Sequence, residues 1–310
     1  MLLLDRFCRW TLKRWDRSVW RLFTGFILLA GLMSSTGCSD LPPAASPVPG
    51  PTFETFGSEA LYDSYAAVLE WVDGSGLVNY SGLKAHRQEL DLFVEKLASF
   101  DRNAYEAMSP SEQIAFWINA YNGSTLLAIV NHYPIQPTLI GSIRFPANSI
   151  RQISGVWDEL RFQVMGEPLT LDQIEHQILR KDFSEPRIHV ALVCAALSCP
   201  PLRNEPFTGE RLREQFDDQI RRFLKNPNNF RIDSADGTVY LSEIFDWYGE
   251  DFIAEFGTKE VGADLSRSEV AVMNYIAPQL SPSDARYLAE EPYRVQYLDY
   301  DWTLNEQRRD

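Results

Sequence analysis

Hydrophobic positions in the first half of the chain recur at intervals of three and four, which is the spacing of helices with one apolar face. This spacing predicts helices over residues 58–72 and 88–100. A third helix is predicted over 109–134, where a Ser-Pro-Ser-Glu sequence supplies a capping box with proline at the first helical position. Its interior is apolar almost all round, so we expect it to be buried.

Two later segments share a different pattern. Residues 160–179 and 230–252 each alternate apolar and polar positions, turn at a glycine, alternate again and continue into a helical pattern. Such a pattern indicates a β-hairpin followed by a helix. Thr170 and Ser242 stand at the expected helix starts, where their hydroxyls can accept a hydrogen bond from the first turn.

The remaining segments complete the predicted fold. Alternation predicts strands over 187–194 and 293–306, and helical spacing predicts helices over 208–224 and 268–280. Because helices dominate early and hairpins late, the fold class is α+β. We expect a helical N-terminal half packed on a small antiparallel sheet built from hairpins.

The N-terminus has the pattern of an export signal. Basic side chains between Arg6 and Arg21 precede a short apolar run and then small residues, so residues 1–37 are predicted to be a secretory signal peptide. Its end, STGC, resembles the lipobox of bacterial lipoproteins, in which the chain is cut before a cysteine that then receives lipid. That cysteine is Cys38, although Ser35 stands where the lipobox usually has leucine. An ordinary signal peptide or an uncleaved anchor remain alternatives.

The part after the signal divides in two. Residues 38–53 are rich in proline, serine and alanine and are predicted to be an extended tether, and 54–310 to be one domain. The chain has a net charge of −14, or about −18 without the basic signal segment. An acidic surface does not attract phosphates, so we expect no nucleic-acid partner. The expected location is the cell envelope, lipid-anchored to a membrane on its periplasmic or outer side.

The stretch PRIHVALVCAALSCPPL at 186–202 concentrates the candidate chemistry. After loss of the signal and lipidation, Cys194 and Cys199 are the remaining cysteines. Export to an oxidising compartment favours a disulfide between them. Plain packing of buried thiols and a zinc site using both cysteines, His176 and His189 are alternatives. The spacing lacks a metal-binding knuckle, so we expect neither a metal nor a cofactor.

A further alternative is thiol catalysis, which needs a nucleophile, a base and a group that orients the base. In a regular strand Cys194 and His189 would lie on opposite faces, so their direct pairing would require a bulge. The candidate residues are Cys199 or Cys194 as nucleophile, His189 or His176 as base, and Asn119, Asn122 or Asp246 as orienting group. The acidic residues that follow Asp246 in the sequence, Glu250 and Asp251, are expected to be solvated.

Five blocks of sequence, in order from about residue 60 to residue 305, resemble the family catalogued as domain of unknown function 547. The blocks are VDGSGLVNYSGLK, IAFWINAYNGSTLLAI, LTLDQIEHQILR, PRIHVALVCAALSCPPLR and YDWTLNE. Members of this family occur in bacteria, often as exported proteins, and in plants and animals. The resemblance implies one domain over nearly the whole mature chain, and it implies no particular reaction.

Two functional hypotheses follow. The first is a non-catalytic envelope module that binds a protein or peptide-like partner and uses its polar residues to hold its core. The second is a cysteine-dependent hydrolase or acyltransferase acting on peptide-like amides. A free thiol beside an imidazole in a pocket would favour the enzyme, and an oxidised or buried pair of cysteines would favour the binding module.

Overall fold

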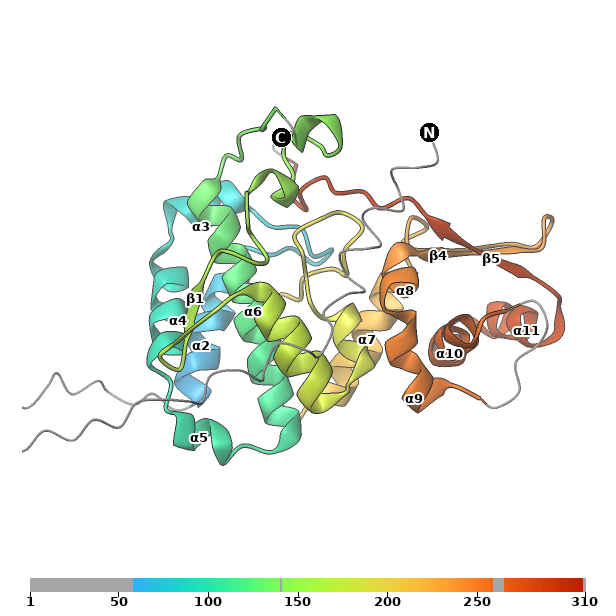
Figure 1. The fold of residues 1–310 in the computed structure, drawn as a ribbon, viewed down its shortest axis with the longest axis horizontal. Coiled ribbons are helices and arrows are strands. Elements are labelled where there is room, and N and C mark those ends of the chain that lie inside the picture. Colours follow the sequence, from blue (N-terminus) through green and yellow to red (C-terminus); the bar gives the residue numbers. More distant parts are fainter. Residues whose placement is uncertain (1–57, 140, 259–264, 309–310) are drawn as a thin grey trace, which may run out of the picture. The chain divides into compact units, whose positions relative to one another are not determined.

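The computed structural model describes residues 58–139, 141–258 and 265–308 (Figure 1). Every described residue lies in one compact unit of the chain. The predicted signal peptide, lipidation site and tether fall outside the described residues. Within the described ranges, no helix combines the length and apolar character that a bilayer span requires.

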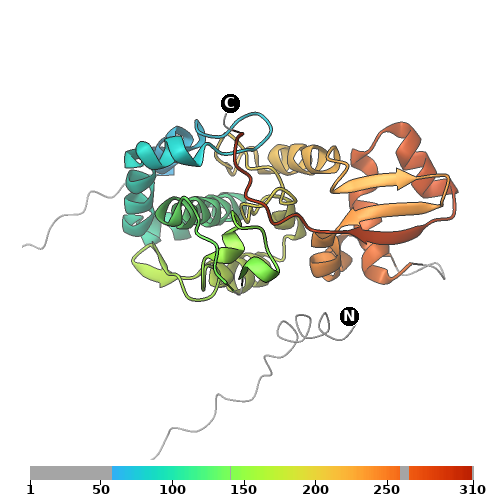
Figure 2. The ribbon, with the colours of Figure 1, turned by 90° about the horizontal axis from the view of Figure 1, so that it is seen from above.

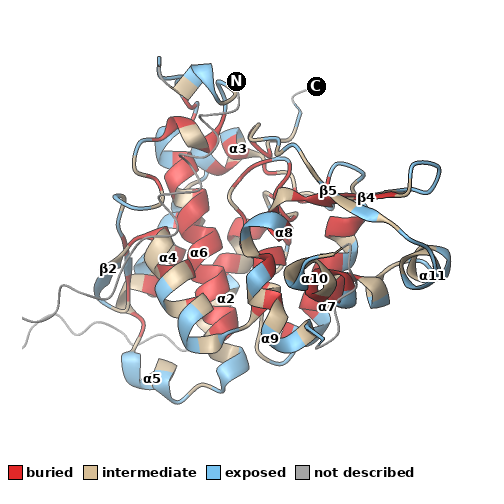
Figure 3. Cartoon of the chain, turned by 45° about the vertical axis from the view of Figure 1, so that its right-hand side comes forward, coloured by how far each residue is buried: buried red, intermediate tan, exposed pale blue. Residues whose placement is uncertain are grey.

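Helix α6 (Pro110–His132) forms the centre of the first half of this unit and is buried along most of its length (Figure 3). It begins with the predicted capping box, in which Ser109 and Glu112 each accept a hydrogen bond from the other's backbone N–H. Helices α3 and α4 pack directly against it, and α2 packs on α4. Among the described residues, the helices before it are α2 (Ser58–Leu69), α3 (Tyr80–Ala85), α4 (Gln88–Ser99) and α5 (Arg102–Glu106).

The first predicted hairpin is confirmed. Strands β1 (Phe162–Val164) and β2 (Glu167–Leu169) pair antiparallel. Both turn residues, Met165 and Gly166, have positive φ, as a tight hairpin turn requires. Their N–H groups donate to carbonyls in the last turn of α4 at 2.9 and 2.8 Å, which fixes the hairpin against the helices.

Short helical segments flank the hairpin. The 3-10 turns η1 (Gly141–Ile143) and η2 (Ile150–Gln152) precede it, and the π-type helix η3 (Gln173–Phe183) follows it. Thr170 caps the helical stretch that begins at Leu171 and continues into η3, as predicted, because its hydroxyl accepts a hydrogen bond from the Gln173 N–H at 3.1 Å.

The predicted strand over 187–194 is wrong. This segment begins with the 3-10 helix η4 (Pro186–Val190), and Glu185 caps its first turn by accepting from the Arg187 N–H at 3.0 Å. Beyond η4 the backbone groups that a neighbouring strand would bind are hydrogen-bonded to the side chain of Asn122 instead. The expectation that alternate side chains point to opposite faces therefore does not apply here.

The second predicted hairpin is also confirmed, and it belongs to a three-stranded sheet. Strands β3 (Phe230–Asp233) and β4 (Thr238–Ser242) pair antiparallel, whereas β5 (Arg294–Leu298) pairs parallel with β4. The order is β3-β4-β5, with β5 along one edge (Figure 2). The sheet is thus mixed, where an antiparallel one was predicted, because β5 returns after the last helices instead of following a hairpin.

Helices cover this sheet, and an apolar core separate from the one around α6 lies between them and the sheet. Phe223, Val239, Phe252 and Ile276 belong to that core, which lies between the sheet and the helices α7, α8 and α10. The α+β class is confirmed. The helical elements here are α7 (Leu212–Leu224), α8 (Glu243–Tyr248), η5 (Gly249–Phe252), α9 (Ile253–Phe256), α10 (Arg267–Ile276), η6 (Ala277–Gln279) and α11 (Pro282–Glu290).

Candidate functional site

Two buried amides on α6 hold the loop that carries the cysteines and the segment that follows it. The Asn122 side chain donates to the Ala191 carbonyl and accepts from the Val193 N–H, both at 2.9 Å. One turn earlier, Asn119 donates to the Phe207 carbonyl at 2.8 Å and accepts from the N–H of the same residue at 2.9 Å. Buried amides are costly unless they are hydrogen-bonded, and here the backbone of the loop satisfies them.

The loop closes on itself through its cysteines. The sulfur atoms of Cys194 and Cys199 lie at disulfide-bond distance, and their Cα atoms are 6.2 Å apart. Between them the chain turns sharply at Ala195, which has a positive φ of 56°. The Cys194 N–H donates to Cys199 Sγ at 3.0 Å. The cysteine pair therefore closes a small loop of the chain.

A third contact reaches the sulfurs from the far end of the chain. The Tyr300 hydroxyl donates to Cys199 Sγ at 3.0 Å and lies 3.1 Å from Cys194 Sγ. Burial raises the pKa of this phenol, so it remains a proton donor at neutral pH. The following segment continues the contact, since the Leu197 N–H donates to the Thr303 carbonyl and the Asn305 N–H donates to the Ala195 carbonyl.

His189 belongs to a separate polar cluster. Its side chain is 1% exposed, its Nε2 lies 2.8 Å from Asp251 Oδ2, and its ring stacks on Tyr248 with centroids 4.0 Å apart. Burial lowers the pKa of His189, although the Asp251 carboxylate opposes that shift. The same carboxylate accepts two hydrogen bonds from Arg180, at 2.7 and 2.8 Å. Asp251 thus joins η3, η4 and η5.

The solvated position predicted for Asp251 is therefore wrong. Its carboxylate is about three-quarters buried and binds two side chains, because η5 turns it toward His189 and Arg180. Hydrogen bonds from both partners hold the pKa of this carboxyl well below its ordinary value, although burial alone would raise it. Asp251, and not Asp246, is the carboxylate that contacts His189.

His176 lies at the edge of this cluster. Its Nδ1 is 3.1 Å from Arg180 Nη1, and its Nε2 is 3.9 Å from an oxygen of Asp172. These neighbours place the imidazole at a partly exposed helix surface rather than beside a thiol. Across the described residues, neither sulfur makes a hydrogen bond to an imidazole, and no three His, Cys, Asp or Glu side chains are gathered as ligands for a metal.

Residues 105–224 match the family model described as Protein of unknown function, DUF547. The match includes every candidate residue predicted here except Asp246 and the anchor Cys38. It ends before Asp251 and Tyr300, which supply the hydrogen bonds to His189 and to the sulfurs. The chain matches no curated protein and no solved structure.

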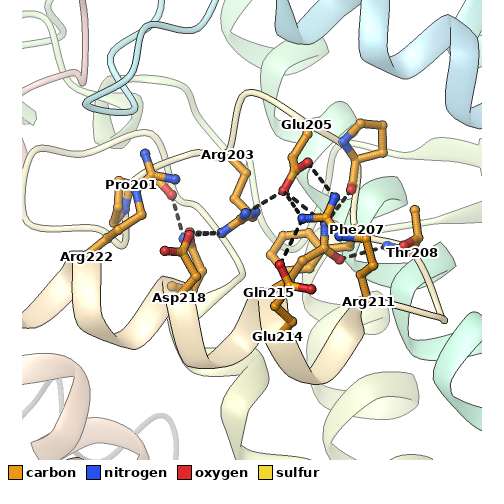
Figure 4. Close-up of polar contacts among 12 residues, drawn as sticks. Pro201, Arg203, Glu205, Phe207, Thr208, Arg211, Glu214, Gln215, Asp218 and Arg222 are labelled. Carbon is orange, nitrogen blue, oxygen red and sulfur yellow. Dashed lines mark hydrogen bonds and ion pairs between the residues drawn. The ribbon is translucent and has the colours of Figure 1, made fainter. Parts of the chain in front are cut away.

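Within the DUF547 match, a network around Arg203 fixes the segment that follows the disulfide loop (Figure 4). Arg203 is buried, and its guanidinium donates to Asp218 and Glu205. Glu205 also accepts from Arg211 at 2.8 Å. Although burial would raise it, hydrogen bonds from these two arginines lower the pKa of Glu205 to about 2. Gln219 donates to the Pro201 carbonyl at 2.6 Å. Helix α7 therefore binds the backbone of this segment through Gln219 and its Arg203 guanidinium through Asp218.

The structure thus brings the predicted residues together in two groups. The Asn122 side chain, on α6, binds the loop that carries the cysteines, and the two histidines share a cluster built on Arg180 and Asp251. Sequence reasoning missed Tyr300 as a partner of the sulfurs. The signal that pointed to it was the conspicuous block YDWTLNE, which begins at this residue and meets the cysteine loop.

Proposed function

We propose that this protein is a non-catalytic binding module of the cell envelope, whose polar residues hold its core. The observation that supports the proposal is the environment of the cysteines. Cys194 and Cys199 have their sulfurs at disulfide-bond distance and hydrogen-bonded to Tyr300, while the candidate base His189 faces Asp251. A thiol nucleophile needs a free thiolate and an imidazole within hydrogen-bond reach, and this arrangement supplies neither.

Export is part of the proposal. Its supports are the basic and apolar pattern of residues 1–37 and the pairing of Cys194 with Cys199, since disulfides persist in oxidising compartments. The proposed membrane partner is reached through lipid on Cys38, with the domain on the periplasmic or outer side. The acidic charge of the chain argues against a nucleic-acid partner.

Thiol labelling tests the binding role against a cysteine-dependent hydrolase or acyltransferase. The purified full chain is treated with a maleimide before and after reduction, and labelled peptides are mapped so that Cys8 and Cys38 are counted separately. Cys194 and Cys199 are expected to be labelled only after reduction. Labelling of both before reduction, with a thiol pKa near 7 or below, would favour an activated nucleophile and overturn the proposal.

Lipid anchoring is tested separately by growing cells with a tagged fatty acid. The wild-type chain is expected to carry the tag, and the Cys38→Ala variant is expected to lose it. A Cys8→Ala variant is the matched control and should keep the tag. Retention of the tag by the Cys38→Ala variant would contradict the proposed anchor.

A further inference from the structure

A pocket of about 370 Å³ lies among the five elements η4, α7, α9, α10 and η6. Arg187 of η4 and Arg213 of α7 contribute positive charge to its lining, and Asp217 of α7 and Glu255 of α9 contribute negative charge. Helix α10 and the turn η6 complete the wall. None of the candidate residues predicted from the sequence lines this pocket.

The wall includes a polar group that the fold leaves unsatisfied. Tyr275 of α10 is 5% exposed, and its hydroxyl has no hydrogen-bond partner among the described residues. Leaving a buried hydroxyl unpaired costs free energy, because the group gives up its hydrogen bond to water and gains none in the protein. Its neighbours Arg187, Asp217 and Glu255 are close enough to influence its ionisation. A ligand that displaced one of these side chains would reach the hydroxyl and satisfy it.

The charged groups at this pocket are not paired with one another. Arg213, Asp217 and Glu255 make no ion pair within 4 Å in the described ranges, even though Arg213 and Asp217 are four residues apart on one helix and Glu255 is close enough to Arg187 to raise its pKa. Arg187 directs two of its nitrogens to Glu185, outside the pocket. Opposite charges that line one cavity without closing on each other suit a ligand that carries both charges.

The remaining wall gives such a ligand polar and apolar surface. Asn274 uses its side-chain N–H on the Phe256 carbonyl, which leaves its oxygen as an acceptor. Gln279 accepts from Arg221, which leaves its side-chain N–H as a donor. Phe256 and Pro278 supply the apolar part of the lining. The volume is at the small end of the roughly 300 to 1,000 Å³ of ligand pockets.

We propose that this pocket binds a small zwitterion, namely a free amino acid or a dipeptide. Its carboxylate faces Arg213, its ammonium group faces Asp217 and Glu255, and its apolar part lies against Phe256. Guanidinium groups bind carboxylates through paired hydrogen bonds, and the ammonium group gains charge-assisted hydrogen bonds to the acidic side chains. The inference rests on the proposed binding role and names the class of ligand.

Calorimetric titration of the full chain tests the charge requirement. The probes are the standard L-amino acids and L-alanyl-L-alanine, with N-acetyl-L-alanine as an anion without ammonium and L-alanine amide as a cation without carboxylate. At least one zwitterion is expected to bind, and both single-charge analogues should bind about tenfold more weakly or worse than the matching zwitterion. Absence of zwitterion binding up to about 10 mM, or equal binding of a single-charge analogue, would overturn the proposal.

Variants locate the binding. Arg213→Ala and Asp217→Asn are each expected to weaken zwitterion binding about tenfold, whereas Arg286→Ala, an exposed arginine on α11, should leave it unchanged. Tyr275→Phe removes the hydroxyl that the ligand is proposed to satisfy, so it should weaken binding. Because this hydroxyl is unpaired in the free protein, the same variant should not lower the melting temperature. Unchanged affinity in both Arg213→Ala and Asp217→Asn would overturn the proposed site.

The two proposals fail separately. If no zwitterion binds while Cys194 and Cys199 are labelled only after reduction, the pocket assignment falls and the non-catalytic role stands. If both thiols react before reduction and have a pKa near 7 or below, the proposed role falls whatever the titration gives.

Discussion

The backbone N–H of Val193 donates a hydrogen bond of 2.9 Å to the side-chain oxygen of Asn122, which lies 71 positions earlier in the chain. The other end of the same amide donates to the Ala191 carbonyl. One side chain thus binds the loop as a neighbouring strand would, through one donor and one acceptor. This contact explains how an apolar, alternating segment remains irregular inside the core.

Replacing Asn122 with alanine is expected to lower the free energy of unfolding by about 2 to 4 kcal/mol, because two buried backbone groups lose their partner. Asn119→Ala should have a similar effect through Phe207. Urea denaturation measures both. Asn131→Ala, at an exposed position of the same helix, is the control and should change stability by less than about 0.5 kcal/mol. A loss at Asn122 no larger than at Asn131 would contradict this account.

Reduction of the cysteine pair is expected to destabilise the domain by about 2 kcal/mol, because a loop this small restricts the unfolded chain only modestly. The measurement is urea denaturation with and without dithiothreitol. A variant with both Cys194→Ala and Cys199→Ala should be insensitive to the reductant. An equal effect of dithiothreitol on that variant would show that the loss of stability arises elsewhere.

The free energy of unfolding is expected to decrease as the pH falls below neutrality. Burial lowers the pKa of His189 below the ordinary value of 6.5, so the unfolded chain binds this proton more readily than the folded chain. The free energy of unfolding therefore decreases as the pH falls below about 6.5 and continues to decrease down to the pKa of the folded state. The Asp251 carboxyl, whose folded pKa is lowered, adds stability that is present above its ordinary pKa of 3.8 and is lost as the pH falls further.

Urea denaturation between about pH 4.5 and 8 measures the histidine contribution, since this window contains its ordinary pKa. His189→Gln should flatten the dependence below pH 6.5, and His86→Gln, at an exposed position, should preserve it. If the slope in the His189→Gln variant equals that of the wild type, another group is responsible.

Gly76 is expected to tolerate no side chain. It has a φ of 88°, and a Cβ atom there would lie 2.6 Å from Pro201 Cβ and 2.8 Å from the Leu202 nitrogen. Gly76→Ala should cost about 2 to 4 kcal/mol through backbone strain and overpacking. Gly74→Ala is the matched control, because a Cβ atom there meets no atom within 4 Å. Thermal unfolding compares the two, and equal melting temperatures would refute the close approach.

The elements with strong local signals were predictable from the sequence. The capping box of Ser109 and Glu112 fixes where α6 begins, and the caps Thr170 and Ser242 mark the ends of the two hairpins. These signals depend on residues within one turn of each other, so no knowledge of distant chain is needed. The α+β class followed from the order of such elements.

The site could be predicted only in its residue types. The sequence contains the amides, the imidazoles and the cysteines, but their partners lie far along the chain, at Asp251 and Tyr300. Alternation also predicted a strand where η4 forms, because hydrophobic pattern reports burial and cannot report which group binds the backbone. That choice fell to Asn122, on a helix some seventy residues away.

By itself, then, the sequence determined the helices, the hairpins and the inventory of polar groups, because these depend on neighbours along the chain. The tertiary structure decided which of those groups meet. It joined the cysteine sulfurs to Tyr300, turned His189 toward Asp251 and left the Tyr275 hydroxyl unpaired beside a pocket. The physical reason is that a buried polar group must find its partner wherever packing brings one, and packing depends on the whole chain.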